Sequence, residues 1–112
     1  MVNMVNKVFH KSLTAERWQT LSLNEQMGNI GSEVGRALKA QTLEAKRLAG
    51  YRALELFDLT LADKRWYGRG SELARAREVF CDFLFGDNEY NSSAENLERY
   101  FMQFALAARL GR

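Results

Sequence analysis

The densest group of side chains that could bind a ligand lies between positions 64 and 77. It contains five cations and two aromatic residues within 14 positions, namely Lys64, Arg65, Trp66, Tyr67, Arg69, Arg75 and Arg77. Cations bind phosphate groups and exposed rings stack on bases, so the pattern indicates a possible RNA or DNA site. A structural alternative is equally economical, because cations favour the last turn of a helix and the two rings would close the end of a helical assembly.

Residues for catalysis are scarce in this sequence. The sole histidine, His10, lies in a segment that we expect to be frayed, so neither a Ser–His–Asp triad nor a Cys–His pair is expected. Cys81 lies beside an apolar helix face, which favours a small buried hydrophobe over a nucleophile. The Glu-x-x-His repeats of di-iron bundles are missing. We therefore predict a protein that is not an enzyme and that holds no metal and no cofactor.

A carboxylate near an apolar face is the remaining group of interest. Asp58 falls between Leu54 and Leu61, where a buried charge would need a partner. Arg36, Arg47, Tyr51 or an arginine of another helix could supply one. A structural ion pair is favoured over an acid–base catalyst.

A capping-box pattern, Ser22-Leu23-Asn24-Glu25, predicts the start of the first long helix. A stripe of apolar residues follows at helical spacing, so we predict a helix over about 23–40. Thr42 is the next plausible cap, for a helix that runs to about Asp63. Neither Gly nor Pro separates these two helices, so one kinked rod is the alternative.

Glycines and a second capping pattern delimit the remaining helices. Gly68 and Gly70 should break the chain, Ser71 should cap a third helix, and Gly86 should end it. The pattern Ser92-Ser93-Ala94-Glu95 predicts a last helix to about Leu110. A short turn over 14–21 would lay Trp18 over the assembly.

No stretch alternates apolar and polar residues as a strand would. We therefore predict an all-α protein, an antiparallel four-helix bundle with a short N-terminal helical segment. Residues 1–112 should form one domain, with 1–13 loosely ordered.

Three glycines inside the first long helix need an explanation, since each costs about 1 kcal/mol relative to alanine. Gly31 and Gly35 flank the apolar stripe, and Gly28 lies one turn before Gly31. We expect a close helix crossing at Gly31 and Gly35, with a ligand groove as the alternative.

Two helices carry more apolar surface than one core can bury. In the second helix we expect Leu43, Leu54, Phe57 and Leu61 to face the core and Leu48, Leu56 and Leu59 to face away from it. In the last helix Met102, Leu106 and Leu110 lie opposite Leu97, Phe101 and Phe104. A symmetric homodimer would cover these surplus faces. We therefore predict an interaction or scaffold protein that acts as a homo-oligomer, with a further protein partner possible.

Composition indicates the cellular compartment but does not identify a ligand. The 112 residues include 16 Lys and Arg against 14 Asp and Glu, a net charge of +2 that neither demands nor excludes a polyanion. The single cysteine cannot form an intramolecular disulfide, which favours a reducing cytoplasm. We expect no secretory signal in the first 13 residues, and no apolar run approaches the roughly 20 residues that cross a membrane.

Residues 22–34, 54–66 and 76–108, with 85–90 inside the last, resemble a small family of bacterial helical proteins. The resemblance covers Trp18 to Arg109 and implies no established activity. The outline also resembles HEPN-type four-helix proteins, several of which are toxin–antitoxin components or RNA-cleaving enzymes. Their nuclease motif places a histidine shortly after an arginine, and no histidine follows His10 here. A HEPN-like fold would therefore lack nuclease activity here. The alternative function, which the cluster at positions 64–77 indicates, is a small RNA- or DNA-binding accessory protein of a toxin–antitoxin or mobile-element system.

Overall fold

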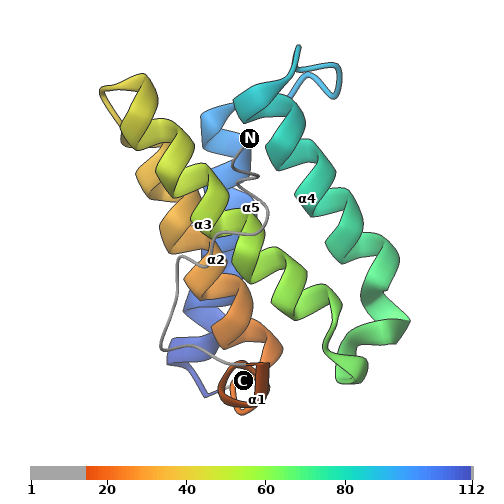
Figure 1. Cartoon of the computed structure of the whole chain (residues 1–112). Coiled ribbons are helices and arrows are strands. Elements are labelled where there is room, and N and C mark those ends of the chain that lie inside the picture. The colour runs from red at the N-terminus through yellow and green to blue at the C-terminus, as the bar shows by residue number, and fades with distance from the viewer. Residues whose placement is uncertain (1–14, 112) are drawn as a thin grey trace.

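The computed structural model describes residues 15–111, and every regular element in that range is helical (Figure 1). The order is α1 Ala15–Trp18, α2 Leu23–Lys39, α3 Leu43–Leu61, the 3-10 helix η2 Lys64–Arg69, α4 Gly70–Phe85 and α5 Ala94–Arg109. The predicted all-α class is confirmed. The expectations for residues 1–13 and for His10 lie outside the described residues.

The predicted start of α2 is confirmed in detail. Ser22 Oγ accepts a hydrogen bond from the Glu25 N–H at 3.1 Å, and Glu25 Oε1 accepts one from the Ser22 N–H at 2.9 Å. Ala40 then adopts an extended conformation with ψ 137°, and Thr42 caps α3 by accepting from the Ala45 N–H. α2 and α3 are therefore two helices and not one kinked rod.

The predicted start of α4 is wrong. The chain does not break at the glycines, because η2 leads directly into α4 at Gly70, and Ser71 lies inside the helix. The change of direction occurs earlier, at Asp63, whose side chain caps η2 by accepting from the Arg65 N–H. A side-chain cap on an earlier residue thus replaces the expected glycine break.

The last helix begins one residue later than the pattern predicts. Ser93, and not Ser92, is the cap of α5, and its hydroxyl accepts from the Asn96 N–H at 3.1 Å. Glu95 therefore takes no part in a capping box, because it sits only two residues after the cap.

Helix α2 is the centre of the fold, with α3 along one side and α5 along the other (Figure 1). Its buried residues include Met27, Ile30 and Val34. Three aromatic rings join the other helices around it. The ring centroid of Phe57 on α3 lies 6.1 Å from that of Phe80 on α4 and 5.9 Å from that of Phe101 on α5. One core therefore draws on all four longer helices.

The predicted core face of α3 is confirmed for Phe57, which is fully buried, and is wrong for Leu43 and Leu56. Leu43 is 61% exposed, whereas Leu56 is 4% exposed and belongs to the core. The buried side is built around Ala49, Gly50 and Ala53, because neighbouring helices approach there. A methyl group on Gly50 would lie 2.6 Å from Leu84 Cδ2 of α4. Small residues at a close helix contact therefore share the buried face with Leu56 and Phe57.

Helix α5 presents the two predicted faces. Leu97, Phe101 and Phe104 are buried, whereas Met102, Leu106 and Leu110 are exposed.

Trp18 of the N-terminal helix α1 is 2% exposed, which confirms that the N-terminal turn lays this ring over the assembly. Between residues 15 and 111, no helix combines the length and apolarity needed to span a bilayer.

Candidate functional site

The cluster predicted to bind nucleic acid contains cations that are already neutralised. Carboxylates pair with three of its arginines: Asp63 with Arg65 at 2.7 Å, Glu72 with Arg69 at 2.7 Å and Asp58 with Arg77 at 3.0 Å. Asp58 thus finds an arginine of another helix, as one alternative predicted, but its side chain is 58% exposed and not buried. These pairs reduce the positive potential that a phosphate would meet.

The two rings of the cluster also differ in their availability. Trp66 is half-buried against the core, donates from Nε1 to Gln26 Oε1 at 3.0 Å and is covered by the Arg65 guanidinium at 4.4 Å. Arg75 lies over the Tyr90 ring at 5.0 Å. Lys64 and Tyr67 remain exposed. The structure therefore favours the structural alternative for most of this segment.

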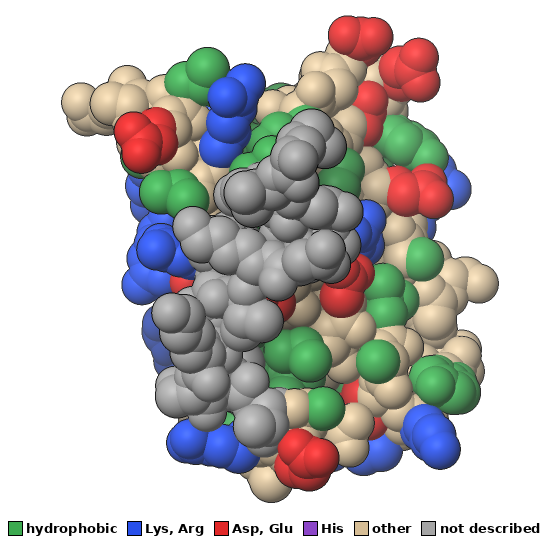
Figure 2. All heavy atoms as spheres, viewed as in Figure 1, with side chains coloured by type: hydrophobic (Ala, Val, Ile, Leu, Met, Phe, Trp, Pro, Cys, Tyr) green, Lys and Arg blue, Asp and Glu red, His purple; other side chains and the backbone are tan. Residues whose placement is uncertain are grey.

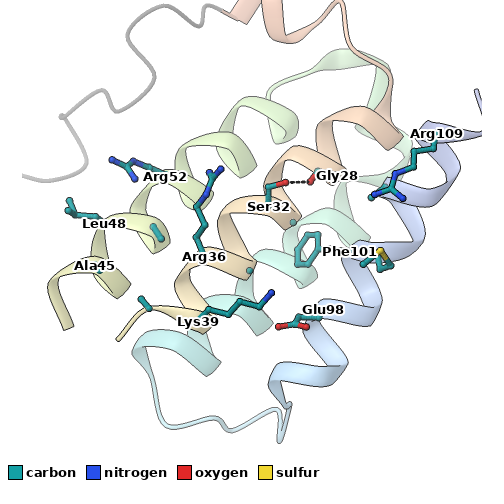
Figure 3. Close-up of a pocket in the computed structure, with 16 residues that line it drawn as sticks. Gly28, Ser32, Arg36, Lys39, Ala45, Leu48, Arg52, Glu98, Phe101 and Arg109 are labelled. Atoms are coloured by element: carbon teal, nitrogen blue, oxygen red, sulfur yellow. Dashed lines mark hydrogen bonds between the residues drawn. The ribbon is translucent and has the colours of Figure 1, made fainter. Parts of the chain in front are cut away.

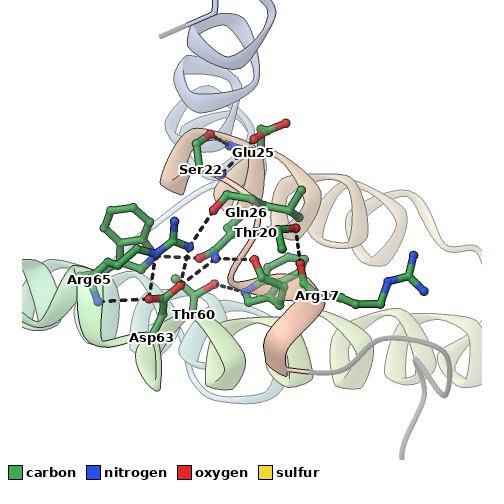
Figure 4. Close-up of polar contacts among 11 residues, drawn as sticks. Arg17, Thr20, Ser22, Glu25, Gln26, Thr60, Asp63 and Arg65 are labelled. Carbon is green, nitrogen blue, oxygen red and sulfur yellow. Dashed lines mark hydrogen bonds and ion pairs between the residues drawn. The ribbon is translucent and has the colours of Figure 1, made fainter.

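A buried polar network ties that segment to α1 and α2 (Figure 4). Gln26 is fully buried and its Nε2 donates to the Trp18 carbonyl at 2.9 Å and to Asp63 Oδ2 at 3.1 Å. Trp18 Nε1 donates to Thr60 Oγ1 at 2.9 Å. Hydrogen bonds from Arg65, opposed by burial and aided by Gln26, lower the pKa of Asp63 to about 2. This network is a structural clamp, and contacts such as Trp18–Thr60, which are 42 positions apart, were not predicted from the sequence.

The glycines of α2 divide into two groups. A methyl group on Gly31 would lie 2.7 Å from Phe101 Cβ, which confirms the close crossing predicted there. At Gly35 no heavy atom lies within 4 Å of the added carbon, so the close crossing predicted for Gly35 is wrong. Gly28 is intermediate, since its added carbon would make ordinary contact with Ala105 at 3.5 Å. Gly35 therefore borders open space.

That open space is a concavity with a volume of about 770 Å³ (Figure 3). We call it the glycine trough. Its α2 side is Gly28, Gly31, Ser32, Gly35, Arg36, Lys39 and Ala40, its α3 side is Ala45, Leu48, Ala49 and Arg52, and its α5 side is Glu98, Phe101, Met102, Ala105 and Arg109. Gly35 helps to keep the trough open because no side chain fills the space above it. The sequence indicated this surface only as the alternative to a tight crossing.

Cations outnumber carboxylates around the glycine trough. Four cations line it, but Glu98 is its one acidic lining residue. Arg36 pairs with Glu33 on its own helix at 2.8 Å. Among residues 15–111, no ion pair engages Lys39, Arg52 or Arg109. Cations also gather along the left edge in Figure 2, on the side of α2 and α3.

The residues predicted to form an oligomer interface fall into four environments. Met102, Leu106 and Leu110 are 51%, 48% and 66% exposed and lie at successive turns of α5, and we call them the α5 ridge. Leu48 lines the glycine trough, as Met102 does. Leu59 is half-buried against the core. Leu56, buried in the core, is not available for an interface.

Two further groups could in principle do chemistry. Burial raises the pKa of the Cys81 thiol, which keeps it protonated at neutral pH, and Arg77 lies near its sulfur. Burial and the neighbouring Glu72 raise the pKa of Tyr100 to about 12. Over the described part of the chain, no group of three or more His, Cys, Asp and Glu side chains is arranged to hold a metal ion.

Comparisons of the chain with models of protein families, with curated proteins and with solved structures found no match. The resemblances to a bacterial helical family and to HEPN-type proteins therefore stay predictions.

Proposed function

We propose that this protein is a non-enzymatic interaction or scaffold protein that acts as a homodimer. The observation that carries the proposal is the α5 ridge, three large apolar side chains that are each about half exposed or more on one face of one helix. In this proposal the four longer helices form an antiparallel bundle that exposes this face of α5. The protein would act in a reducing cytoplasm, where the single free thiol of Cys81 stays reduced.

The energetic argument concerns surface that folding leaves in water. Burial of apolar surface stabilises by roughly 25 cal/mol per Å², so a contiguous row of exposed Met and Leu favours association. A second copy supplies an identical row, and a twofold axis lets both rows be buried by one contact. A single exposed apolar side chain is normal on a protein surface, but three large ones at successive turns of one helix indicate an interaction surface.

Sedimentation velocity at micromolar concentration tests the proposal. We expect a species of twice the 12.9 kDa chain mass. Leu106→Glu should give a monomer with an unchanged far-UV circular dichroism spectrum. Leu43→Glu is the matched control, because Leu43 is similarly exposed but lies on α3 outside the ridge. A wild-type chain that sediments only as a 12.9 kDa species would refute the proposed function.

The second candidate function is an RNA- or DNA-binding accessory role. The unpaired cations of the trough, Lys39, Arg52 and Arg109, favour it more than the neutralised cluster does. Fluorescence titration with mixed oligonucleotides at low salt tests it. Binding should weaken steeply with salt, and Arg52→Gln should reduce it more than Arg69→Gln. Absence of binding at low salt would remove this candidate.

A further inference from the structure

We propose that the two copies pack α5 against α5 in antiparallel orientation, so that the α5 ridge of each enters the glycine trough of the other. This inference rests on the proposed homodimer and specifies its interface. It commits the trough to one occupant, a second copy of this chain.

The size of a stable interface requires more than the ridge. Stable interfaces bury roughly 800 Å² and involve about 20–30 residues on each partner, far more than three side chains provide. The adjoining surface must therefore take part. Met102 belongs to both the ridge and the trough wall, so a raised apolar strip and a concave apolar surface adjoin on one face. A twofold contact needs such a self-complementary face, with projection and hollow side by side.

Charge fixes the orientation of the two helices. Glu98 and Arg109 both line the trough, and they lie about three helical turns apart on the same side of α5. An antiparallel pairing centred between them places each Glu98 beside Arg109 of the second copy. A parallel pairing would instead bring like charges together. Glu98 and Arg109 have no ion-pair partner among residues 15–111, so both are available for this contact.

The same register explains the space above Gly35. Helices α2 and α5 run antiparallel, because Gly28 lies at Ala105 and Gly31 lies at Phe101. One further turn brings Gly35 level with Glu98. Since Arg109 of the second copy pairs with Glu98, Leu110 of that copy arrives at the level of Gly35. The position that is empty within one chain therefore receives an apolar side chain from the other.

Charge reversal tests this interface by sedimentation equilibrium. Glu98→Arg and Arg109→Glu should each weaken dimerisation about tenfold, since each places two like charges together at both ends of the contact. The double variant should restore the wild-type dissociation constant. Lys64→Glu is the control, because Lys64 is exposed on η2 away from this face, and it should leave dimerisation unchanged.

Filling the trough provides an independent test. Gly35→Leu should weaken dimerisation by about tenfold or more through overlap with the incoming side chain, while the monomer keeps its fold because nothing lies near the added carbon. Ser71→Leu adds the same side chain at an exposed site on α4 and should have no effect on association.

The outcomes separate the inference from the proposed function. If Leu106→Glu disrupts the dimer but Gly35→Leu and both charge reversals leave its dissociation constant unchanged, the antiparallel interface is wrong. The proposed homodimer would still be supported. Two single charge variants whose effects add, with no restoration in the double variant, would also overturn it. A monomeric wild-type chain would remove both proposals.

Discussion

Alanine at Gly31 and alanine at Gly35 should change stability in opposite directions, although both residues lie within α2 and one turn apart. The substitution removes the flexibility of glycine in the unfolded chain and improves helix propensity by up to about 1 kcal/mol at either position. The difference arises from what the new methyl group meets. At Gly31 it would lie 2.7 Å from Phe101 Cβ, and at Gly35 it meets nothing within 4 Å.

The magnitudes follow from that contrast. The Phe101 Cβ is attached directly to the α5 backbone, so the clash at Gly31 is relieved only by moving the helix. Overpacking of this kind costs roughly 1–3 kcal/mol, which leaves a net loss of about 0–2 kcal/mol after the gain in propensity. Gly35→Ala should stabilise by up to about 1 kcal/mol, which raises Tm by roughly 4 °C.

Urea unfolding followed by circular dichroism measures both free energies. The variants are best compared in the Leu106→Glu background, so that any association does not contribute to the free energy of unfolding. The free energies of unfolding of the two variants should differ by about 1–3 kcal/mol, because the propensity gain is common to both and only Gly31→Ala is overpacked. Gly35→Ala should be more stable than the parent and Gly31→Ala less stable. Equal stabilisation by both would refute the close crossing of α2 and α5 at Gly31.

Three further predictions concern other contacts. Every group that faces the Asp63 carboxylate is a donor, so Asp63→Asn should destabilise the fold by about 2–4 kcal/mol at neutral pH, as measured by urea unfolding. Because folding lowers the pKa of Asp63 from 3.8 to about 2, its ionised form contributes roughly 2 kcal/mol that is fully present above about pH 4 and lost as pH falls through 2. The stability gap between wild type and Asp63→Asn should therefore narrow over that interval, and a constant gap would contradict the assigned cause. Trp18→Phe leaves the buried Thr60 hydroxyl without its donor and should cost about 1–3 kcal/mol in the same assay, whereas an unchanged midpoint would show that this hydrogen bond is dispensable. Gly50→Ala should change Tm by only a few degrees, since the methyl group would meet the flexible ends of the Leu84 and Phe85 side chains, which can rotate aside, and a large fall in Tm would show that α4 holds these side chains in place.

Local signals in the sequence determined most of the helices. The capping box of Ser22 and Glu25 and the cap of Thr42 depend on residues at most three positions apart, so they are formed by almost any tertiary arrangement. The inward stripe of Leu97, Phe101 and Phe104 was equally predictable, because these large apolar residues recur at helical spacing. The all-α class follows from these local patterns.

Tertiary structure decided which faces those helices bury and which groups they bring together. The buried face of α3 includes Ala49, Gly50 and Ala53, and small residues carry little hydrophobic signal until a neighbouring helix is known to approach. Gly31 and Gly35 are alike in sequence, and only the line along which α5 crosses α2 separates a tight contact from an open trough.

The cluster at positions 64–77 shows the same limit for a candidate site. Its residue types suggested a cationic surface, but Arg77 meets Asp58 from another helix and Trp66 meets the buried Gln26. A charge attracts phosphate only when no nearby carboxylate has already paired with it, and a ring can stack on a base only when its face is uncovered. Both conditions depend on residues distant in the chain, so they exist only once the helices have packed.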